Sequence, residues 1–519
     1  MISLAGGEKQ RCFVVSGGAG TGKTHFLQYI LIKRLLDGKA TTIQFDKDHI
    51  FWFNNDGVFV VQSWNQPDLL SNLLTNNHLI HLVDVPLNPE DVLLQAVGVM
   101  VTTSSPFDLA SSYKWMDRQV PTACVLWMEP PSWEETYVVC KHFAPPFFKS
   151  DDLTQVPRLF LTYGPSISMC LNLAGSPSRE AVHIQNINYA LHSLKYASHW
   201  LPLPDAEGGY ARYTSFLFGF HSPTSLPESE RQINKHDNFG FFISQCFPLS
   251  SYIIKRLFEL ALQSNPRQGK NLLLDLTRNP RTRDAAELFF ELAVSHRLRN
   301  GPRLLTDRRS SSVQYFNLSP LPPYFAGQPS SNVVGFNIRS LSPDSEVNVQ
   351  FSLSQLPEMI RKYPGHLLTP LQNSWPSVKY IMVRYPGDDS QQDSELGNSL
   401  ASVENAHIYV ILPTLDMNPV LLVEELEKIR QAIPDGFLGS KWDKWSLIVV
   451  QLTEQAGEEI TEPVVLNTKC PSSMMDYKEK NGMIEWKRRL EQFTLKVSAE
   501  QLFGPVQGKK MEMDAGSKL

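Results

Sequence analysis

The chain has 519 residues, of which 42% are apolar and 19% charged, and its formal net charge is −5. This composition excludes a disordered chain, and at roughly 150 residues per domain the length predicts two to four globular domains. The acidic balance excludes a general attraction to nucleic acid or anionic membranes, so any such contact must use a local basic patch.

The first part of the chain alternates strand and helix patterns. The predicted elements are a strand at 11–16, a helix at 24–36, a β-hairpin at 50–61, and strands at 79–85, 97–103 and 124–128. The helix ends at Asp37-Gly38, and the hairpin turns at Asn54 to Gly57. Such alternation predicts an α/β domain over residues 1–165, with a parallel sheet and helices on both faces.

The rest of the chain divides by pattern into four further segments. Residues 166–300 have long helical periodicity and predict a helical lid or connector. Residues 301–332 are rich in Pro, Ser and Gly and predict a linker. Residues 333–505 mix strand and helix patterns, which predicts a second α/β domain, and the polar tail at 506–519 is expected to fray. In the second domain we expect strands at 378–384, 407–412 and 445–452 and a helix at 420–431.

A glycine-rich motif follows the first predicted strand. Its residues are Gly17, Gly18, Ala19, Gly20, Thr21, Gly22, Lys23 and Thr24, which match the phosphate-loop pattern Gly-x-x-x-x-Gly-Lys-Ser/Thr in full. Glycines let the backbone curl around a phosphate with its N–H groups inward, and the following helix presents its positive end. Lys23 can reach the β- and γ-phosphates, and Thr24 can offer a hydroxyl to magnesium. The motif predicts a nucleoside triphosphate site with Mg²⁺. ATP is favoured over GTP, because no Asn-Lys-x-Asp guanine motif follows.

The apolar run 78–84 predicts a buried strand that ends in an acid, Asp84. Asp84 is the candidate magnesium partner of the loop, directly or through water, and a strand-end turn residue is the alternative. Val85 follows where many ATPases have a glutamate that polarises water, so hydrolysis is expected to be slow or to use a base from elsewhere. Thr103 or Ser104, after the next strand, is a candidate γ-phosphate contact, with strand-end hydrogen bonding as the alternative.

Arginines supply further candidates for phosphate contact. Arg158, in the segment Val156-Pro157-Arg158, could reach the nucleotide from the helical region, and a structural or surface arginine is the alternative. Arg118 is a weaker candidate. Basic runs at 299–309 and 487–489 could meet nucleic acid, and solvated surface charge is the alternative.

Cysteine spacing and apolar runs indicate the compartment. The six cysteines form no Cys-x-x-Cys pair, so we expect reduced, mostly buried thiols and no zinc site, and His78 and His81 are not expected to bind metal. No apolar run reaches the roughly 18 residues of a membrane span, and residues 1–10 lack the apolar core of a signal peptide. The sequence predicts an intracellular protein of the cytoplasm or nucleus, or a secreted effector if it is part of a longer chain.

The order of these features resembles the P-loop modules of crinkler effectors and retrotransposon hot spot proteins. The matching pieces are the loop at 17–24, the aromatic hairpin at 51–58, Leu-Val-Asp at 82–84, Ser-Ser-Pro at 104–106, Tyr-Lys at 113–114, the segment 127–135, Val-Pro-Arg at 156–158 and the helical stretch 288–301. They are specific in their order and together span about residues 10–430. The resemblance implies an ATP- and Mg²⁺-dependent P-loop NTPase acting as an effector-like or mobile-element-derived regulator.

In that family a restriction-endonuclease-like domain often follows the P-loop domain. Such domains hold magnesium with a helix glutamate, an aspartate and a Glu/Gln-x-Lys/Thr strand. The resemblance places Glu291 as the helix acid, but Lys379 stands where the aspartate is expected. Val410 and Leu412 stand where polar residues are expected, and aliphatic side chains cannot ligate a metal. The resemblance therefore implies a C-terminal α/β restriction-endonuclease-like domain that has lost its activity.

Several functions stay open at this point. The first is Mg²⁺-dependent ATP binding, with slow hydrolysis, coupled to the C-terminal module. The second is an NTP-dependent DNA nuclease with a live C-terminal site, and the third is an ATP-binding pseudo-enzyme that serves as a scaffold. A small-molecule kinase is disfavoured, since no acceptor site is evident. Beyond the nucleotide, the expected partners are nucleic acid or a protein client and no membrane, and the oligomeric state is left open.

Overall fold

The fold is taken from a computed structural model of the whole chain. It describes residues 12–18, 20–46, 49–61, 79–84, 98–102, 124–143, 150–195, 200, 215–220, 246–278, 282–300, 318–320, 350–362, 367–370, 378–384, 407–416, 420–433, 445–452, 465–467 and 490–503. The chain divides into two compact units, residues 1–285 and 286–519, and each is described here by itself.

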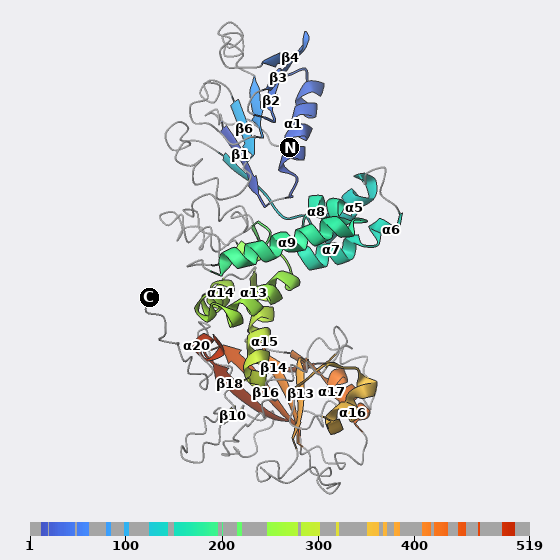
Figure 1. The fold of residues 1–519 in the computed structure, drawn as a ribbon, viewed down its shortest axis with the longest axis vertical. Coiled ribbons are helices and arrows are strands. Elements are labelled where there is room, and N and C mark those ends of the chain that lie inside the picture. The colour runs from blue at the N-terminus through green and yellow to red at the C-terminus, as the bar shows by residue number, and fades with distance from the viewer. Residues whose placement is uncertain are drawn as a thin grey trace, which may run out of the picture. The chain divides into compact units, whose positions relative to one another are not determined.

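The first unit contains a seven-stranded sheet (Figure 1). Its strands are β1 (Cys12–Gly17), β2 (Thr41–Gln44), β3 (Ile50–Asn54), β4 (Gly57–Val61), β5 (Ile80–Val83), β6 (Gly98–Thr102) and β7 (Cys124–Met128). In space their order is β4-β3-β2-β5-β6-β1-β7. The five strands from β2 to β7 in this order are parallel, and β3 and β4 add an antiparallel hairpin at the β2 edge. The predicted strands and hairpin are confirmed, and the sheet is mixed because the hairpin joins it.

Helix α1 (Lys23–Leu36) covers one face of this sheet. It packs on β1, β2, β5 and β6 and buries Leu27 completely. Together with Leu27, the core under the helix contains Phe13, Val15, Ile43, Leu82 and Met100. This packing confirms the helix predicted at 24–36. The helices expected on the other face lie outside the described residues.

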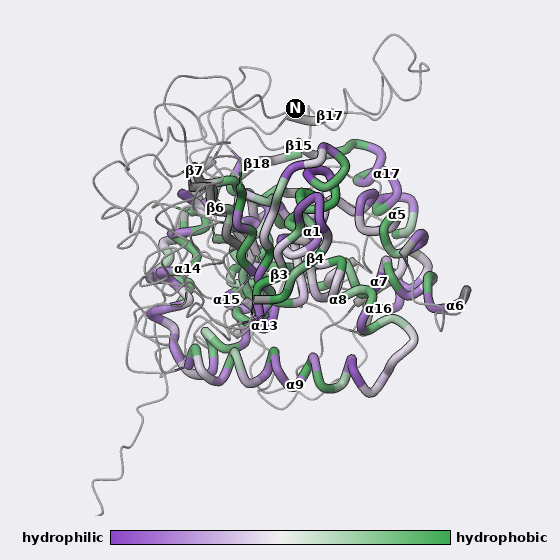
Figure 2. Tube along the Cα trace, turned by 90° about the horizontal axis from the view of Figure 1, so that it is seen from above, coloured by the Kyte–Doolittle hydropathy of each residue, from purple (hydrophilic) through white to green (hydrophobic). Residues whose placement is uncertain are grey.

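Helices follow the last strand of the sheet. They are α5 (Trp133–Phe143), α6 (Ser150–Leu153), α7 (Val156–Tyr163), α8 (Ile167–Leu173), α9 (Pro177–Leu194), α13 (Ser251–Gln263) and α14 (Pro266–Arg278), with a small hairpin of β8 (Phe218–Phe220) and β9 (Cys246–Pro248). The helical region begins before the expected boundary at 166. The reason is a capping box at α5: Ser132 N donates to Glu135 Oε2 at 2.8 Å, and Glu135 N donates to Ser132 Oγ at 3.1 Å. Hydrophilic and hydrophobic residues alternate along α9, as expected of a half-buried helix (Figure 2).

The second unit is built around another seven-stranded sheet, in the order β10-β18-β16-β14-β13-β12-β11. Its strands are β10 (Leu318–Pro320), β11 (Gln350–Phe351), β12 (Leu367–Pro370), β13 (Tyr380–Arg384), β14 (His407–Pro413), β16 (Trp445–Leu452) and β18 (Glu491–Val497), and a separate pair is formed by β15 (Val420–Leu422) and β17 (Val465–Asn467). Strands β12, β13 and β14 form an antiparallel meander, and β14, β16 and β18 are parallel.

The helices of this part of the chain are α15 (Arg283–Asn300), the short η3 (Leu353–Gln355), α16 (Leu356–Lys362), α17 (Val423–Ala432) and α20 (Ala499–Phe503). Helix α15 begins just before the division between the units, and its residues from 286 onward belong to the second unit.

Two details of the second unit differ from the sequence-based prediction. Strand β10 lies inside the range 301–332 expected to be a linker, and it pairs antiparallel with β18. The helix expected at 420–431 begins only at Val423, because residues 420–422 pair with β17 instead. The strands expected at 378–384, 407–412 and 445–452 are confirmed by β13, β14 and β16.

Candidate functional site

The loop between β1 and α1 adopts a conformation that requires glycine. A Cβ on Gly17 would lie 2.6 Å from the carbonyl oxygen of Met128 at the end of β7. Gly20 and Gly22 have φ angles of +76° and +93°, which side chains of L-residues rarely adopt. Gly22 is also the N-cap of α1 and offers no side-chain acceptor, so the first-turn N–H groups of the helix are not capped by a side chain.

Lys23 folds back over this loop. Its Nζ donates to the carbonyl oxygen of Gly17 at 3.0 Å and to that of Gly18 at 2.7 Å. Thr21 Oγ1 also donates to Gly18 O, at 2.9 Å, which closes the loop on itself. The ammonium is thus held against the loop backbone, where an anion bound by the loop would meet it.

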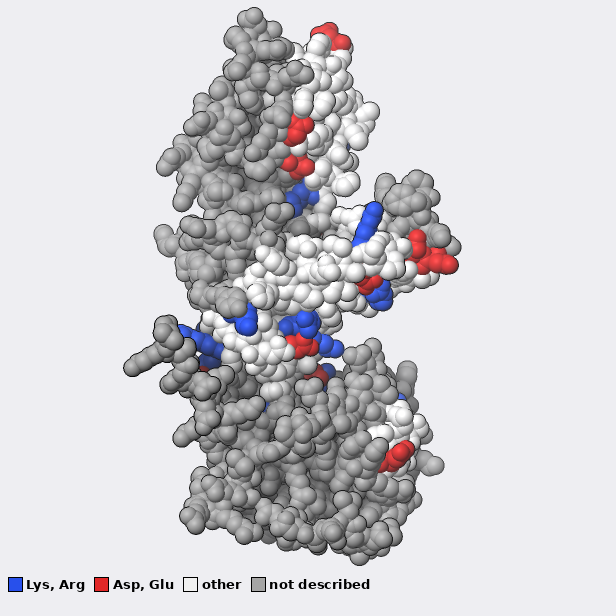
Figure 3. All heavy atoms as spheres, in the orientation of Figure 1, with Lys and Arg blue, Asp and Glu red and all other residues white. Residues whose placement is uncertain are grey.

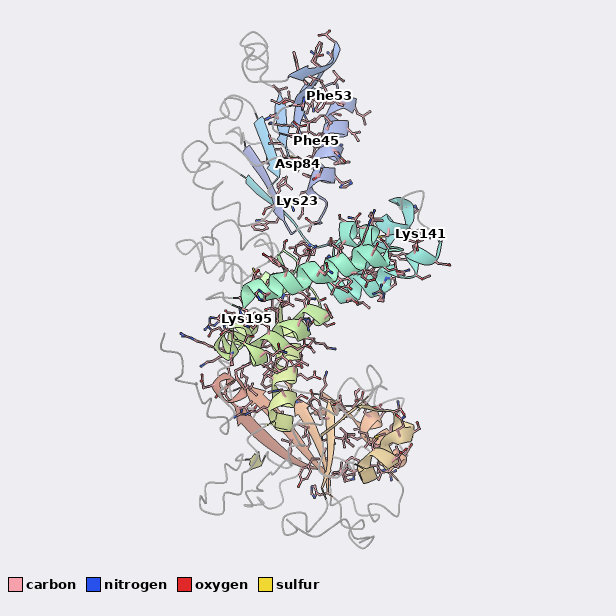
Figure 4. The ribbon with its side chains drawn as sticks, in the orientation of Figure 1. Lys23, Phe45, Phe53, Asp84, Lys141 and Lys195 are labelled. Carbon is pink, nitrogen blue, oxygen red and sulfur yellow. The ribbon has the colours of Figure 1, made fainter. Side chains whose placement is uncertain are left out.

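Thr24 and Asp84 meet although they are 60 residues apart in the chain. Thr24 lies in the first turn of α1, and Asp84 directly follows β5. The Thr24 hydroxyl donates to Asp84 Oδ2 at 2.7 Å. Asp84 N donates to the carbonyl oxygen of Gln44 at 2.9 Å, so the backbone of Asp84 continues the ladder between β5 and β2. Figure 4 shows Lys23 and Asp84 near each other, at the end of the sheet where α1 begins.

A single Mg²⁺ ion could contact both of these oxygens. Octahedral magnesium binds oxygen at 2.0–2.1 Å, which places neighbouring ligand oxygens about 2.9 Å apart. The observed 2.7 Å between Thr24 Oγ1 and Asp84 Oδ2 is close to that spacing. The described residues contain no group of three or more His, Cys, Asp or Glu side chains that could hold a metal by themselves. A magnesium ion here would therefore need further oxygens from a bound phosphate and from water.

His81 lies inside the sheet, on the strand that leads to Asp84. It lies on β5, is completely buried, and its Nδ1 is 2.9 Å from Thr42 Oγ1 on the neighbouring strand β2. Burial lowers the pKa of His81 to about 4, so the ring is neutral at pH 7. His81 is thus a core residue, while His78 lies outside the described residues.

The structure pairs Arg158 within the helical region instead of bringing it to the loop. Its guanidinium makes a bidentate pair with Glu180 on α9, with N–O distances of 2.6 and 2.8 Å. Tyr163 Oη also donates to Glu180, at 2.8 Å. This network raises the pKa of Arg158, chiefly through the hydrogen bond to Glu180, and links α7 to α9. The described contacts of Arg158 are those of the structural alternative, and its phosphate contact stays a prediction.

One residue beside the loop was missed in the sequence. Ser166, the N-cap of α8, lies so close to Gly20 that a Cβ on the glycine would collide with Ser166 Oγ. The only signal was the Gly164-Pro165-Ser166 turn pattern, which does not indicate a contact with the loop. Five other residues considered in the sequence lie outside the described residues: Ala19, Val85, Thr103, Ser104 and Arg118.

The candidate nuclease residues form an ion pair. Lys379 Nζ lies 3.2 Å from Glu291 Oε2, and Tyr380 Oη donates to the backbone oxygen of Glu291 at 3.3 Å. Val410 and Leu412 on β14 are buried in the hydrophobic core. The nuclease-like role of Glu291 stays a prediction, and its described charged partner is the ammonium of Lys379.

Three described arginines of the helical region, Arg158, Arg256 and Arg278, are paired with acids. Arg256 pairs with Glu259 on α13, and Arg278 pairs with Asp275 on α14. In Figure 3, blue and red atoms lie next to each other over the helices of the first unit. The basic runs at 299–309 and 487–489, expected as candidate nucleic-acid contacts, lie almost wholly outside the described residues.

In the described part of the chain, the free cysteines are buried, namely Cys140, Cys170 and Cys246. Burial raises the pKa of Cys140 to about 11 and that of Cys170 to about 12. It also raises the pKa of Cys246 well above its usual value. These thiols are therefore protonated and unreactive at pH 7, which confirms the expectation for these three positions. Within the described part of the chain, no helix combines the length and apolarity needed to cross a bilayer.

Comparison with known proteins leaves the family open. The chain matches no protein-family model, and a search of curated proteins finds no match either. The resemblance to crinkler effectors and retrotransposon hot spot proteins therefore rests on the order of the sequence motifs.

Proposed function

We propose that the first unit binds a nucleoside triphosphate, with ATP preferred, together with Mg²⁺ at the loop 17–24. The observation that carries the proposal is the 2.7 Å hydrogen bond between Thr24 and Asp84. A phosphate-loop motif alone predicts a phosphate site. A nucleotide bound with magnesium also needs protein oxygens for the metal ion. The Asp84 carboxylate, bonded to the Thr24 hydroxyl of the motif, supplies them.

The strand order explains how these distant residues meet. Strand β6 lies between β1, which leads into the loop, and β5, which leads to Asp84. With strands about 4.8 Å apart, the ends of β1 and β5 are separated by about 10 Å. Helix α1 crosses over this gap and packs on all three strands, so its first turn can reach Asp84. Ligands of parallel α/β sheets bind at the carboxyl ends of the strands, where this pair lies.

Each residue then has a role toward the nucleotide. The loop N–H groups and the start of α1 bind phosphate oxygens, and Lys23 neutralises their charge. Thr24 and Asp84 hold the Mg²⁺ ion, which when bound offsets charge on the β- and γ-phosphates. Val85 offers no base for water, so turnover is slow in this proposal. The same residue favours the second candidate function, an ATP-binding scaffold without turnover.

For the second unit we propose a restriction-endonuclease-like domain that does not cut DNA. The chain order α15, β12, β13, β14, α17 and β16 supports this proposal, because Glu291, Lys379 and Val410 lie on or next to successive elements of that order. Lys379 offsets the negative charge of Glu291, and Val410 and Leu412, which stand where the resemblance expects polar residues, are buried aliphatic groups. This module would couple nucleotide state to a nucleic acid or a protein client, in an effector-like role.

Intracellular action, in the cytoplasm or nucleus, completes the proposal. ATP and Mg²⁺ are abundant there, and the three described cysteines are unpaired, as is usual in reducing compartments.

The proposal is tested by calorimetric titration of the full chain with ATP in the presence of Mg²⁺. Lys23→Ala removes the ammonium that meets the phosphates, so we expect at least about a hundredfold loss of affinity, as for loss of several charge-assisted hydrogen bonds. Lys33→Ala is the matched control, because Lys33 is exposed in the last turn of the same helix and should not change binding. Wild-type affinity in the Lys23→Ala protein would contradict the proposal.

A further inference from the structure

Among the described residues, Ser166 and Ser168 bring the helical region close to the phosphate loop. Ser166 precedes α8, and its Oγ lies against Gly20, leaving no room for a side chain there. Ser168, two residues further on, also lies close to Gly20. Gly20 is therefore a glycine for two reasons, its positive φ and the serine beside it. The contact joins two parts of the first unit that are about 145 residues apart in the chain.

The Ser166 hydroxyl has donor capacity facing this loop. Its Oγ accepts a hydrogen bond from Met169 N at 3.3 Å, which uses one lone pair. A hydroxyl also carries one proton that rotates toward an available acceptor. Among the described residues the structure shows no acceptor for this proton. A phosphate oxygen held by the loop would be such an acceptor.

The backbone around Ser166 is fixed on its other side by α13. Gly164 has a φ of +107°, and a Cβ there would lie 2.7 Å from both Cβ and O of Leu249. The next residue, Ser250, caps α13: its Oγ accepts from Ile253 N at 3.2 Å and donates to Thr162 O at 2.5 Å. The turn 164–166 is thus packed between the phosphate loop and the start of α13. Because Gly164 is in tight contact with Leu249, we expect a displacement of Ser166 to displace Leu249 as well.

We propose that Ser166 is a ligand of the terminal phosphate and lets the helical region distinguish triphosphate from diphosphate. This inference rests on the proposed nucleotide site. The hydroxyl donates a charge-assisted hydrogen bond to the phosphate, and the turn 164–166 transmits its position to α13. The donor is the Ser166 hydroxyl, which lies against Gly20. Ser166 then acts as a sensor of nucleotide state that belongs to the helical region and not to the loop itself.

The test is calorimetric titration with Mg²⁺–ATP and Mg²⁺–ADP, using the full chain and Ser166→Gly. Glycine removes the hydroxyl but is nearly as good as serine at a helix N-cap. We expect about tenfold weaker ATP binding with unchanged ADP binding, as for loss of one hydrogen bond to a charged group. The matched control is Ser176→Gly, because Ser176 is the N-cap of α9 and its side chain makes no capping bond. It should change neither affinity.

A second readout follows the signal into α13 without relying on affinity. In the wild type, ATP should slow hydrogen exchange of the amides at 250–254 more than ADP does, and Ser166→Gly should remove that difference. An unchanged ratio of ATP to ADP affinity in Ser166→Gly would overturn the inference, and so would an equal loss for both nucleotides, which indicates a structural role. If Ser166→Gly does not fold, hydrogen exchange of the wild type decides, and equal protection of the amides at 250–254 by ATP and ADP would overturn the inference. Failure of the wild type to bind either nucleotide would instead refute the proposed function.

Discussion

The two units each bring an acid to a place where a cation could be bound, and they differ in what stands beside it. In the first unit, Asp84 is bonded to the neutral hydroxyl of Thr24. In the second unit, Glu291 is bonded to the ammonium of Lys379. A carboxylate bonded to a neutral hydroxyl can face a metal ion without a competing cation, whereas a metal ion approaching a carboxylate paired with a lysine is repelled by the ammonium. The partner of the acid, more than the acid itself, therefore indicates whether a metal site survives.

The surroundings of Asp84 also suit a metal ion better than those of Glu291 do. Near Asp84 lie a glycine loop and the uncapped start of α1, which both favour a phosphate. In the second unit, Val410 and Leu412 on β14 belong to a hydrophobic core. Water and further oxygen ligands can complete a magnesium shell at the first place, while aliphatic groups cannot at the second.

The largest expected difference concerns nucleotide affinity. Asp84→Asn removes the charge that faces Mg²⁺ but keeps the size of the side chain and an acceptor for Thr24. We expect roughly a hundredfold loss of ATP affinity with Mg²⁺ and a much smaller change in EDTA, since loss of a charged partner at a desolvated site costs several kcal/mol. Glu291→Gln is the matched control in the second unit and should leave ATP binding unchanged. Equal losses of ATP affinity in the two variants would show that Asp84 and Glu291 do not differ in this way.

Acid should destabilise the first unit through His81. The unfolded chain takes up a proton on His81 near pH 6.5, whereas the folded chain does so only near its lowered pKa of about 4. The unfolded state thus binds more protons between these values, and the free energy of unfolding falls as the pH drops, by up to about 3 kcal/mol.

Urea unfolding of the wild type and His81→Gln at pH 7.5, 6 and 5 measures this effect. Glutamine can still hydrogen-bond Thr42 but does not titrate, so its pH dependence should be weaker. If the free energy of unfolding changed equally with pH in both proteins, His81 would not be the group that causes the loss of stability in acid.

The smallest expected effect is on the stability of the second unit. Glu291→Gln leaves the Lys379 ammonium without its partner at a partly buried position, where the two side chains are 20% and 31% exposed. We expect a loss of about 1 kcal/mol, between the values for surface and buried pairs. Double substitution with Lys379→Met should recover part of it. A thermal melt of the three proteins measures this, and a gain in stability for Glu291→Gln alone would show that the pair does not stabilise the unit.

Local patterns allowed much of this site to be predicted. The glycine loop, the helix after it and Asp84 each depend on neighbouring residues in the chain, so motif and periodicity were sufficient. Ser166 could not be found, because its role arises from a tertiary contact with Gly20. Arg158 was assigned to phosphate since nothing in the sequence pairs it with Glu180 on another helix.

The same distinction, between features set by neighbouring residues and features set by tertiary contacts, separates the elements that were predicted from those that were missed. The hairpin at β3 and β4 was predicted from its Asn-Asn-Asp-Gly turn, in which Asn54 Oδ1 accepts from the amides of Asp56 and Gly57. Strand β10 was missed because Leu318–Pro320 is too short to have a period and depends on pairing with β18. The capping box at Ser132 and Glu135 was part of the family-like segment 127–135, so one piece of the resemblance has a purely structural reason.

The most direct test of the account is to count bound metal ions by the loss of the free Mn²⁺ signal in electron paramagnetic resonance. The account predicts one Mn²⁺ per chain that binds only with ATP, is lost in Asp84→Asn and is retained in Glu291→Gln. Mn²⁺ that binds without nucleotide and disappears in Glu291→Gln would contradict it, because the metal would then belong to the second unit.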